Sequence, residues 1–101
     1  MLTSKQRAYL RSLANSLDSQ FQIGKGEVDE QVVRSLDEYM TTHELVKITI
    51  LKTADEPASQ IAAQLSQAIG AEVVQIIGRR LVFYRYSPKL AKQGKSMTVP
   101  F

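Results

Sequence analysis

The sequence predicts a single α/β domain in which three helices pack against a four-stranded mixed sheet, in the order αβαβαββ. Segments with a helical repeat of apolar residues alternate with short apolar segments of strand length, which is the pattern of layered helices and strands. The chain has 101 residues, of which 44% are hydrophobic, and this composition suits one globular core.

The first helix is expected from Thr3 to Leu17. Gln6 stands three residues after Thr3, the spacing of a capping box, in which each side chain bonds the other residue's backbone amide. One helical face is apolar and is formed by Leu10, Leu13, Ala14 and Leu17. The bases of this helix fall largely away from that face, where they meet solvent or a partner: Lys5, Arg7 and Arg11.

A short strand is expected at residues 20–23, with Phe21 and Ile23 pointing to the same side. Gly24 and Gly26 follow it directly, and glycine permits the positive φ angles that a tight turn into the next element requires.

The second helix is expected at residues 29–42, with Asp29 as its N-cap and an inward stripe of Val32, Val33, Leu36, Tyr39 and Met40. The nearly continuous apolar run at 45–51 predicts a central strand. A third helix follows the start signal that ends in Pro57, and Gly70 stops it.

Two further strands, at 72–77 and 81–86, are joined across Gly78-Arg79-Arg80 and predict an antiparallel hairpin. Strand–helix–strand connections are right-handed crossovers between parallel strands, so at least one pair in this sheet is parallel. We therefore expect one domain over residues 1–86. Residues 87–101 are polar, basic and aperiodic, and we expect a flexible tail there.

The charges are sorted along the chain although the formal net charge is only +3. All ten acids lie between Asp18 and Glu72, whereas residues 79–101 carry six bases and no acid. Clustered cations attract a polyanion better than scattered ones do. A solvated surface with a basic tail is the alternative interpretation of the same pattern.

Several kinds of chemistry are not expected from this sequence. Without cysteine there is no disulfide, thiolate nucleophile or Cys-ligated zinc site, and a lone His43 does not complete a usual zinc site. No nucleotide-binding glycine fingerprint or serine–histidine–acid set is present. We therefore expect no enzyme activity, metal or cofactor. The chain opens with a polar helix and lacks long apolar runs, so we expect a cytoplasmic protein without a membrane segment.

The loop Gly24-Lys25-Gly26 is the strongest local indication of a ligand. Free backbone N–H groups ahead of a helix hold anions, and a lysine adds a mobile positive charge that suits phosphate. Taken alone, a plain strand-to-helix turn is the commoner explanation of two such glycines.

Four segments together resemble the CRM domain, the chloroplast RNA splicing and ribosome maturation domain, in its stand-alone bacterial YhbY-like form. They are residues 2–14, 21–26, 43–48 and 74–85. The resemblance implies an RNA-binding module with a fold similar to the C-terminal domain of translation initiation factor three. It also implies a bacterial protein that associates with precursors of the large ribosomal subunit. The family loop reads Gly-x-x-Gly, whereas Glu27 stands here at the fourth position.

The sequence thus predicts a non-catalytic protein that binds RNA, with ribosomal RNA in large-subunit assembly as the expected partner, and it predicts a monomer. The candidate RNA-binding residues are Gly24, Lys25, Gly26, Lys5, Arg7, Arg11, Arg79, Arg80 and Arg85. Phe83 and Tyr84 alternate on a strand, so the outward one is a candidate to stack a base. The alternative function is a protein–protein adaptor whose basic charge is incidental.

Overall fold

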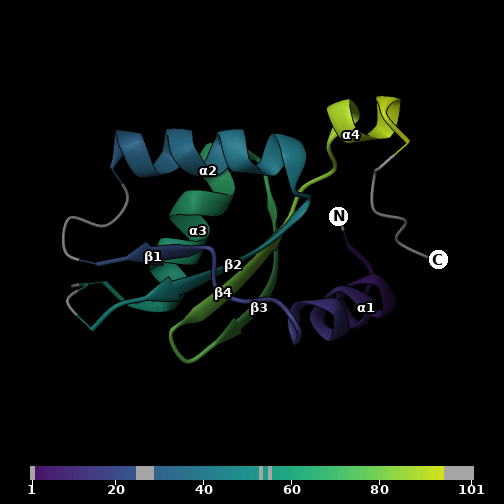
Figure 1. The fold of residues 1–101 in the computed structure, drawn as a ribbon. Coiled ribbons are helices and arrows are strands. Elements are labelled where there is room, and N and C mark those ends of the chain that lie inside the picture. The colour runs from purple at the N-terminus through teal and green to yellow at the C-terminus, as the bar shows by residue number, and fades with distance from the viewer. Residues whose placement is uncertain (1, 25–28, 53, 55, 95–101) are drawn as a thin grey trace.

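A computed structural model describes residues 2–24, 29–52, 54 and 56–94 of the chain. The elements follow one another as α1 (Ser4–Ala14), β1 (Phe21–Ile23), α2 (Glu30–Thr42), β2 (Leu45–Ile50), α3 (Ala58–Ile69), β3 (Glu72–Ile77), β4 (Arg80–Tyr84) and α4 (Pro88–Lys92) (Figure 1). The seven predicted elements are therefore confirmed, and the short helix α4 is an addition to them.

The four strands form one sheet in the order β1-β2-β4-β3. The β1–β2 pair is parallel and the other two pairs are antiparallel, which confirms the mixed sheet. β2 lies inside the sheet, as its continuous apolar sequence predicts. The β3–β4 hairpin carries a register shift between Val73 and Gln75.

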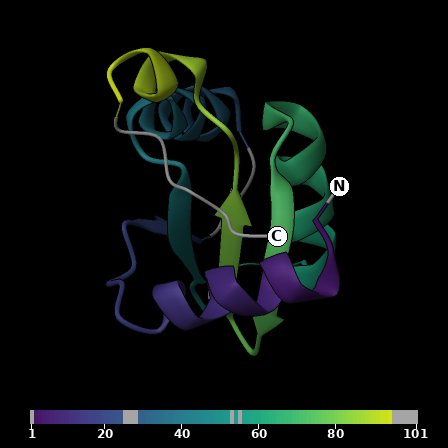
Figure 2. The same cartoon turned by 90° about the vertical axis from the view of Figure 1, so that its right-hand side faces the viewer.

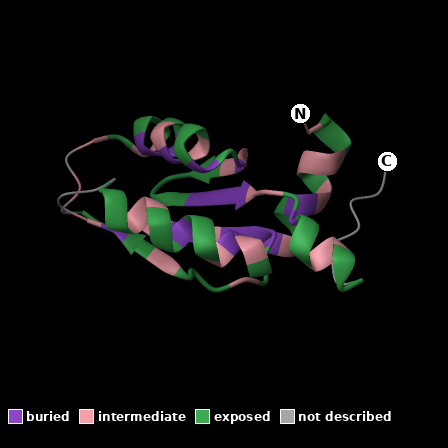
Figure 3. Cartoon of the chain, turned by 90° about the horizontal axis from the view of Figure 1, so that it is seen from above, coloured by how far each residue is buried: buried purple, intermediate pink, exposed green. Residues whose placement is uncertain are grey.

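Helices cover both faces of the sheet. Seen from the side, α1 crosses in front of the strands, while α2 and α3 lie on the other face (Figure 2). The larger apolar cluster joins α2 and α3 to the sheet through residues that include Leu36, Met40, Ile48, Ile61, Leu65 and Phe83. A smaller cluster lies under α1 and contains Leu10, Ala14, Leu45, Val74 and Val82. The buried residues of the strands and of the sheet-facing helix sides form this interior (Figure 3).

The capping box predicted for α1 is present. The Thr3 amide donates to Gln6 Oε1 at 2.9 Å, and the Gln6 amide donates to Thr3 Oγ1 at 3.1 Å. At the other end of α1, Lys47 Nζ donates to the carbonyl oxygens of Ala14 and Leu17, at 3.2 and 3.3 Å. Since Lys47 belongs to β2, this contact fixes the C-terminal end of α1 over the middle of the sheet.

Gly70 ends α3 with a φ of 66°, the left-handed conformation in which a helix commonly terminates at glycine. A Cβ atom at this position would meet no heavy atom within 4 Å, so only the backbone opposes a side chain there. Gly70→Ala should therefore lower the free energy of unfolding by about 1 kcal/mol, and Gly70→Asn by less, because asparagine tolerates this conformation. Urea unfolding of the two variants measures the difference; equal losses would contradict the backbone explanation.

Helix α4 differs from the loose tail expected after residue 86. Ser87 is buried, and its hydroxyl accepts from the Leu90 amide at 3.3 Å while donating to the Thr41 carbonyl at 2.6 Å. The Ser87 amide donates to the buried Glu44 carboxylate at 2.6 Å. These bonds cap α4 and hold it beside the end of α2. Residues 95–101 lie outside the described part of the chain, so the flexible tail stays a prediction there.

Candidate nucleic-acid interface

One end of the sheet brings three predicted site residues together. The Leu51 amide donates to the Ile23 carbonyl at 2.7 Å, and the Ile50 amide donates to the Arg79 carbonyl at 2.6 Å. Gly24 at the end of β1 therefore lies on one side of the end of β2, and the turn at Arg79, which leads into Arg80 of β4, lies on the other side. Lys25 and Gly26, the rest of the predicted loop, lie outside the described residues.

At this end of the sheet a row of four side chains occupies the face on which α1 packs. Arg80 pairs with Thr49 on one side and with Ile77 on the other, and Thr49 pairs with Gln22. Cross-strand partners share a face, and Val82, two residues after Arg80, packs under α1. Helix α1 covers only the other half of this face. The row formed by Gln22, Thr49, Arg80 and Ile77, which we call the open row, remains uncovered by it.

The cations around the open row are available to an anion. Arg79, Arg80 and Lys52 are exposed and, within the described part of the chain, none of them forms an ion pair. A hollow of about 260 Å³ leads from Arg80 toward the C-terminal end of α1; Lys47 and Asp18 are among the residues that line it.

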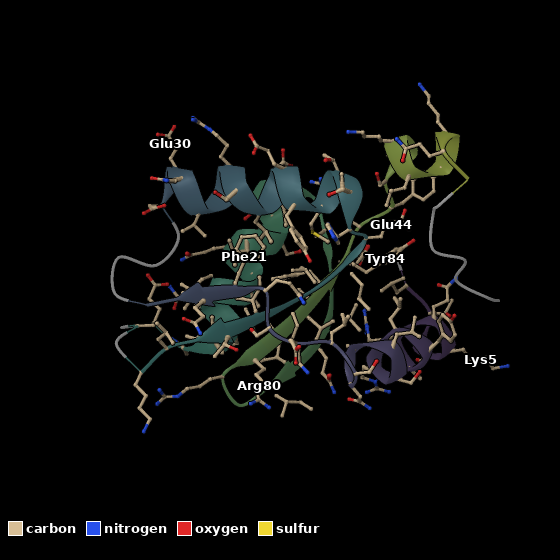
Figure 4. The ribbon with its side chains drawn as sticks, viewed as in Figure 1. Lys5, Phe21, Glu30, Glu44, Arg80 and Tyr84 are labelled. Atoms are coloured by element: carbon tan, nitrogen blue, oxygen red, sulfur yellow. The ribbon has the colours of Figure 1, made fainter. Side chains whose placement is uncertain are left out.

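Helix α1 adds cations on the same side of the sheet. Lys5 and Arg11 are exposed, and Lys5 extends from the far end of the helix (Figure 4). Arg7 is half-buried, and its Nε atom is enclosed without a hydrogen-bond partner among the described residues. It stands three residues before the buried Leu10, so it borders the inward stripe of α1 and does not lie fully outside it.

On the opposite face of the sheet, helix α2 is mostly acidic. Helix α2 carries Glu30, Asp37 and Glu38 and one base, Arg34, whereas α1 carries only bases among its charged residues. Glu30 projects from the side away from Lys5 and Arg80 (Figure 4). Charge therefore separates α1 from α2, while Lys89 and Lys92 of the basic C-terminal segment lie on α4, beside the end of α2. We call the side bearing Lys5, Arg11, Lys52, Arg79 and Arg80 the cationic face.

The N-terminus of α2 is already occupied by carboxylates. Asp29 accepts the Val32 amide at 2.8 Å, which confirms the predicted N-cap, and Glu30 stands in the first turn. The Asp29 carboxylate accepts a backbone amide that would otherwise lack a partner, and both carboxylates offset the partial positive charge at this end of the helix. A phosphate near Gly24 therefore depends on the loop and its lysine, and less on the end of α2.

Arg85 is separated from the other candidates by its bonds. Its guanidinium donates to the Asp37 carboxylate at 2.5 Å, to the Ile69 carbonyl at 2.9 Å and to the Asp37 carbonyl at 2.8 Å. Its charge is paired, and its bonds join α2 to the end of α3. We therefore leave Arg85 out of the cationic face.

The variant Arg85→Ala should destabilise the fold without changing nucleic-acid binding. Removing the guanidinium leaves two backbone carbonyls without their partner, and we expect a loss of roughly 1–2 kcal/mol, discounted because the Asp37 side chain is 55% exposed. Chemical denaturation measures the loss. The matched test is an RNA titration at several salt concentrations, in which a lower salt slope for Arg85→Ala would show that the residue contacts phosphate.

The two aromatic residues predicted as candidates for base stacking, Phe83 and Tyr84, pack against the apolar core. Phe83 faces inward and is buried, as alternation requires, and the outward Tyr84 is half-buried against the cluster under α1. Burial, followed by the nearby charge of Glu44, raises the pKa of the Tyr84 phenol. His43 stacks on Tyr39, with ring centroids 4.0 Å apart.

Among the described residues, no cluster of metal-ligating side chains is present and no helix is long and apolar enough to cross a bilayer.

Lys52 is the site residue that sequence reasoning missed. It stands two residues after the end of β2, and the parallel β1–β2 pairing places the end of β2 beside Gly24. The sequence does contain an indication of this position. Lys52 is a base that comes just after a central strand, and the glycine loop begins at the same end of the parallel neighbouring strand.

The sequence and the fold have counterparts in known proteins. The model of the CRS1 / YhbY (CRM) domain matches residues 2–85. Probable RNA-binding protein YqeI of Bacillus subtilis is 34% identical over 99% of this chain and 100% of its own length. An RNA-binding protein of Haemophilus influenzae is 30% identical over 85% of this chain and 87% of its own.

A solved structure agrees with these relatives. The solution structure of the hypothetical protein SAV1595 from Staphylococcus aureus superposes with a TM-score of 0.79 at 38% identity, covering 99% of this chain and 100% of that one. The chain belongs to the CRS1 / YhbY (CRM) domain family.

Proposed function

We propose that the protein is a non-catalytic RNA-binding factor that holds the RNA backbone on its cationic face. The observation that carries this proposal is the set of exposed cations on α1 and at the end of the sheet, none of which forms an ion pair within the described part of the chain, whereas the surface of α2 is mostly acidic. The names of the bacterial relatives, which describe RNA-binding proteins, support it.

The mechanism is electrostatic. Arg79, Arg80 and Lys52 contact phosphates at the end of the sheet, and Lys5 and Arg11 extend the contact along α1. Lys25, which lies outside the described residues, is proposed to add a further phosphate contact from the Gly24-Lys25-Gly26 loop. Each phosphate that is neutralised releases counterions, so affinity falls as salt rises.

The RNA we propose is ribosomal RNA in precursors of the large subunit. Family resemblance supports this partner, and a broad cationic face suits a factor that holds a folded RNA. Crosslinking in cells, followed by sequencing of the attached nucleotides, tests it. Enrichment of large-subunit ribosomal RNA is expected. Enrichment of unrelated transcripts only would contradict the ribosomal assignment but not RNA binding.

Sedimentation of cell extracts separates the RNA-binding proposal from a protein adaptor. We expect the protein to travel with large-subunit particles and to leave them after nuclease digestion. Association that survives both nuclease and high salt would indicate that the partner is a polypeptide.

The variant Lys25→Ala tests the glycine loop. If the lysine contacts a phosphate, RNA affinity should fall roughly fivefold for all sequences, and the slope of log affinity against log salt should decrease by about one. A fluorescence titration at several salt concentrations measures both quantities. An unchanged slope would remove Lys25 from the binding surface.

A further inference from the structure

The end of the sheet carries a groove whose apolar residues have no part in the phosphate contacts proposed above. It has a volume of about 460 Å³ and lies between the end of β2 and the β3–β4 turn, with Leu51 and Ile77 among its apolar lining residues. Both are exposed, at 38% and 60%, and they line the same groove. The volume falls in the range of ligand pockets, ~300–1,000 Å³.

The rim of this groove is positively charged. Lys52, Arg79 and Arg80 line it together with Thr49, and no described acid does. Four other hollows on the described surface each include a carboxylate, supplied by Glu72, Asp18, Asp29 and Glu44. The combination of an apolar floor and a cationic rim is therefore a distinguishing property of this groove.

An unpaired nucleotide has the matching chemistry. Its base offers flat apolar faces, and the phosphates on either side of it are anions held within a few ångströms of the base. A paired base presents only its edge, because its faces are stacked inside the helix. A groove with aliphatic walls and three cations at its rim suits the unstacked nucleotide better than the duplex.

We propose that this groove, lined by Thr49, Leu51, Lys52, Ile77, Arg79 and Arg80, binds one unpaired nucleotide of the RNA, with its base against Leu51 and Ile77. The site rests on the proposed RNA-binding function and deepens it. The cationic face then supplies affinity for any RNA, and the groove supplies preference for RNA with unpaired nucleotides.

The edge strand β3 offers a matched pair of variants. Ile76 and Ile77 are adjacent and both exposed, but Ile76 pairs with Leu81 of the larger cluster and lies on the other face, outside the groove. Ile77→Ala and Ile76→Ala therefore remove the same atoms from the same strand on opposite faces. Neither side chain is buried, so both variants should fold.

The experiment compares a synthetic RNA hairpin with an unpaired loop and a continuous duplex with the same number of phosphates. Ile77→Ala should weaken hairpin binding by about five- to tenfold, the loss expected when one to two methylene groups no longer contact the base. Duplex binding and the salt slope should not change. Ile76→Ala should bind both RNAs as the unsubstituted protein does.

The possible failures are distinguishable. If the unsubstituted protein binds neither RNA, the proposed function fails and the groove proposal fails with it. If it binds both RNAs and Ile77→Ala equals Ile76→Ala, the groove proposal is overturned and the electrostatic function stands. If Ile77→Ala instead abolishes a nuclease-resistant association with a protein while hairpin binding is intact, the groove is a protein-docking site and the proposal is likewise overturned.

Discussion

Replacing both hairpin arginines, Arg79→Ala with Arg80→Ala, should weaken RNA binding roughly thirtyfold at about 0.1 M salt. The two residues are exposed, and neither pairs with an acid in the described part of the chain, so both guanidinium groups are free to contact phosphate. Losing two phosphate contacts should also lower the salt slope by about 1.5. Titration of a fluorescent RNA at several salt concentrations measures the affinity and the slope together.

A matched control removes the same kind of charge from the other side of the molecule. Arg34 is an exposed arginine on α2, among the acids Glu30, Asp37 and Glu38. Arg34→Ala changes the net charge by one unit but should leave the salt slope as it is. If Arg34→Ala lowers the slope as much per charge as the double variant does, binding depends on overall charge and the cationic face is not the site.

The largest effect on stability is expected from Phe83→Ala. Phe83 lies in the interior strand β4, is fully buried and pairs with Val46 on one side and Val73 on the other. Truncating a buried phenylalanine removes its contacts and leaves a cavity, which costs about 3–5 kcal/mol. Since a domain of this size is stabilised by only about 5–15 kcal/mol, a large share of its stability would be lost.

Urea unfolding followed by circular dichroism measures this loss. Tyr86→Ala is the control, because Tyr86 follows β4 but is 56% exposed, and we expect it to change stability by about 0.5 kcal/mol or less. A loss below about 1 kcal/mol for Phe83→Ala would mean that the core relaxes around the position, contrary to the packing described here.

The elements that could be predicted are those whose signals are local. Thr3 and Gln6 are three residues apart, and their reciprocal bonds depend on that spacing alone. Gly70 marks the end of α3 because its backbone angle is one that other residues disfavour. The strands and their inward residues follow from alternation and from continuous apolar runs. In each case the physical cause lies within a few residues of its effect.

The features that could not be predicted depend on residues distant in the chain. Arg85 bonds Asp37 across 48 positions, and charge alone does not separate this structural arginine from Arg79 and Arg80, which form no ion pair with any described residue. Helix α4 is too short for a periodic pattern and depends on Ser87, whose amide bonds the buried Glu44. The groove at the end of the sheet exists because parallel pairing and the hairpin place Leu51 and Ile77 together, far apart in sequence.

We expect RNA to occupy the α1 side of the sheet and its open end. Amide chemical-shift mapping of the isotope-labelled protein, titrated with the RNA hairpin, tests this most directly. We expect the largest shifts at Gly24, Thr49, Lys52, Arg79 and Arg80, with smaller ones along α1. Shifts concentrated on the outer side of α2, or none even at low salt, would contradict the account.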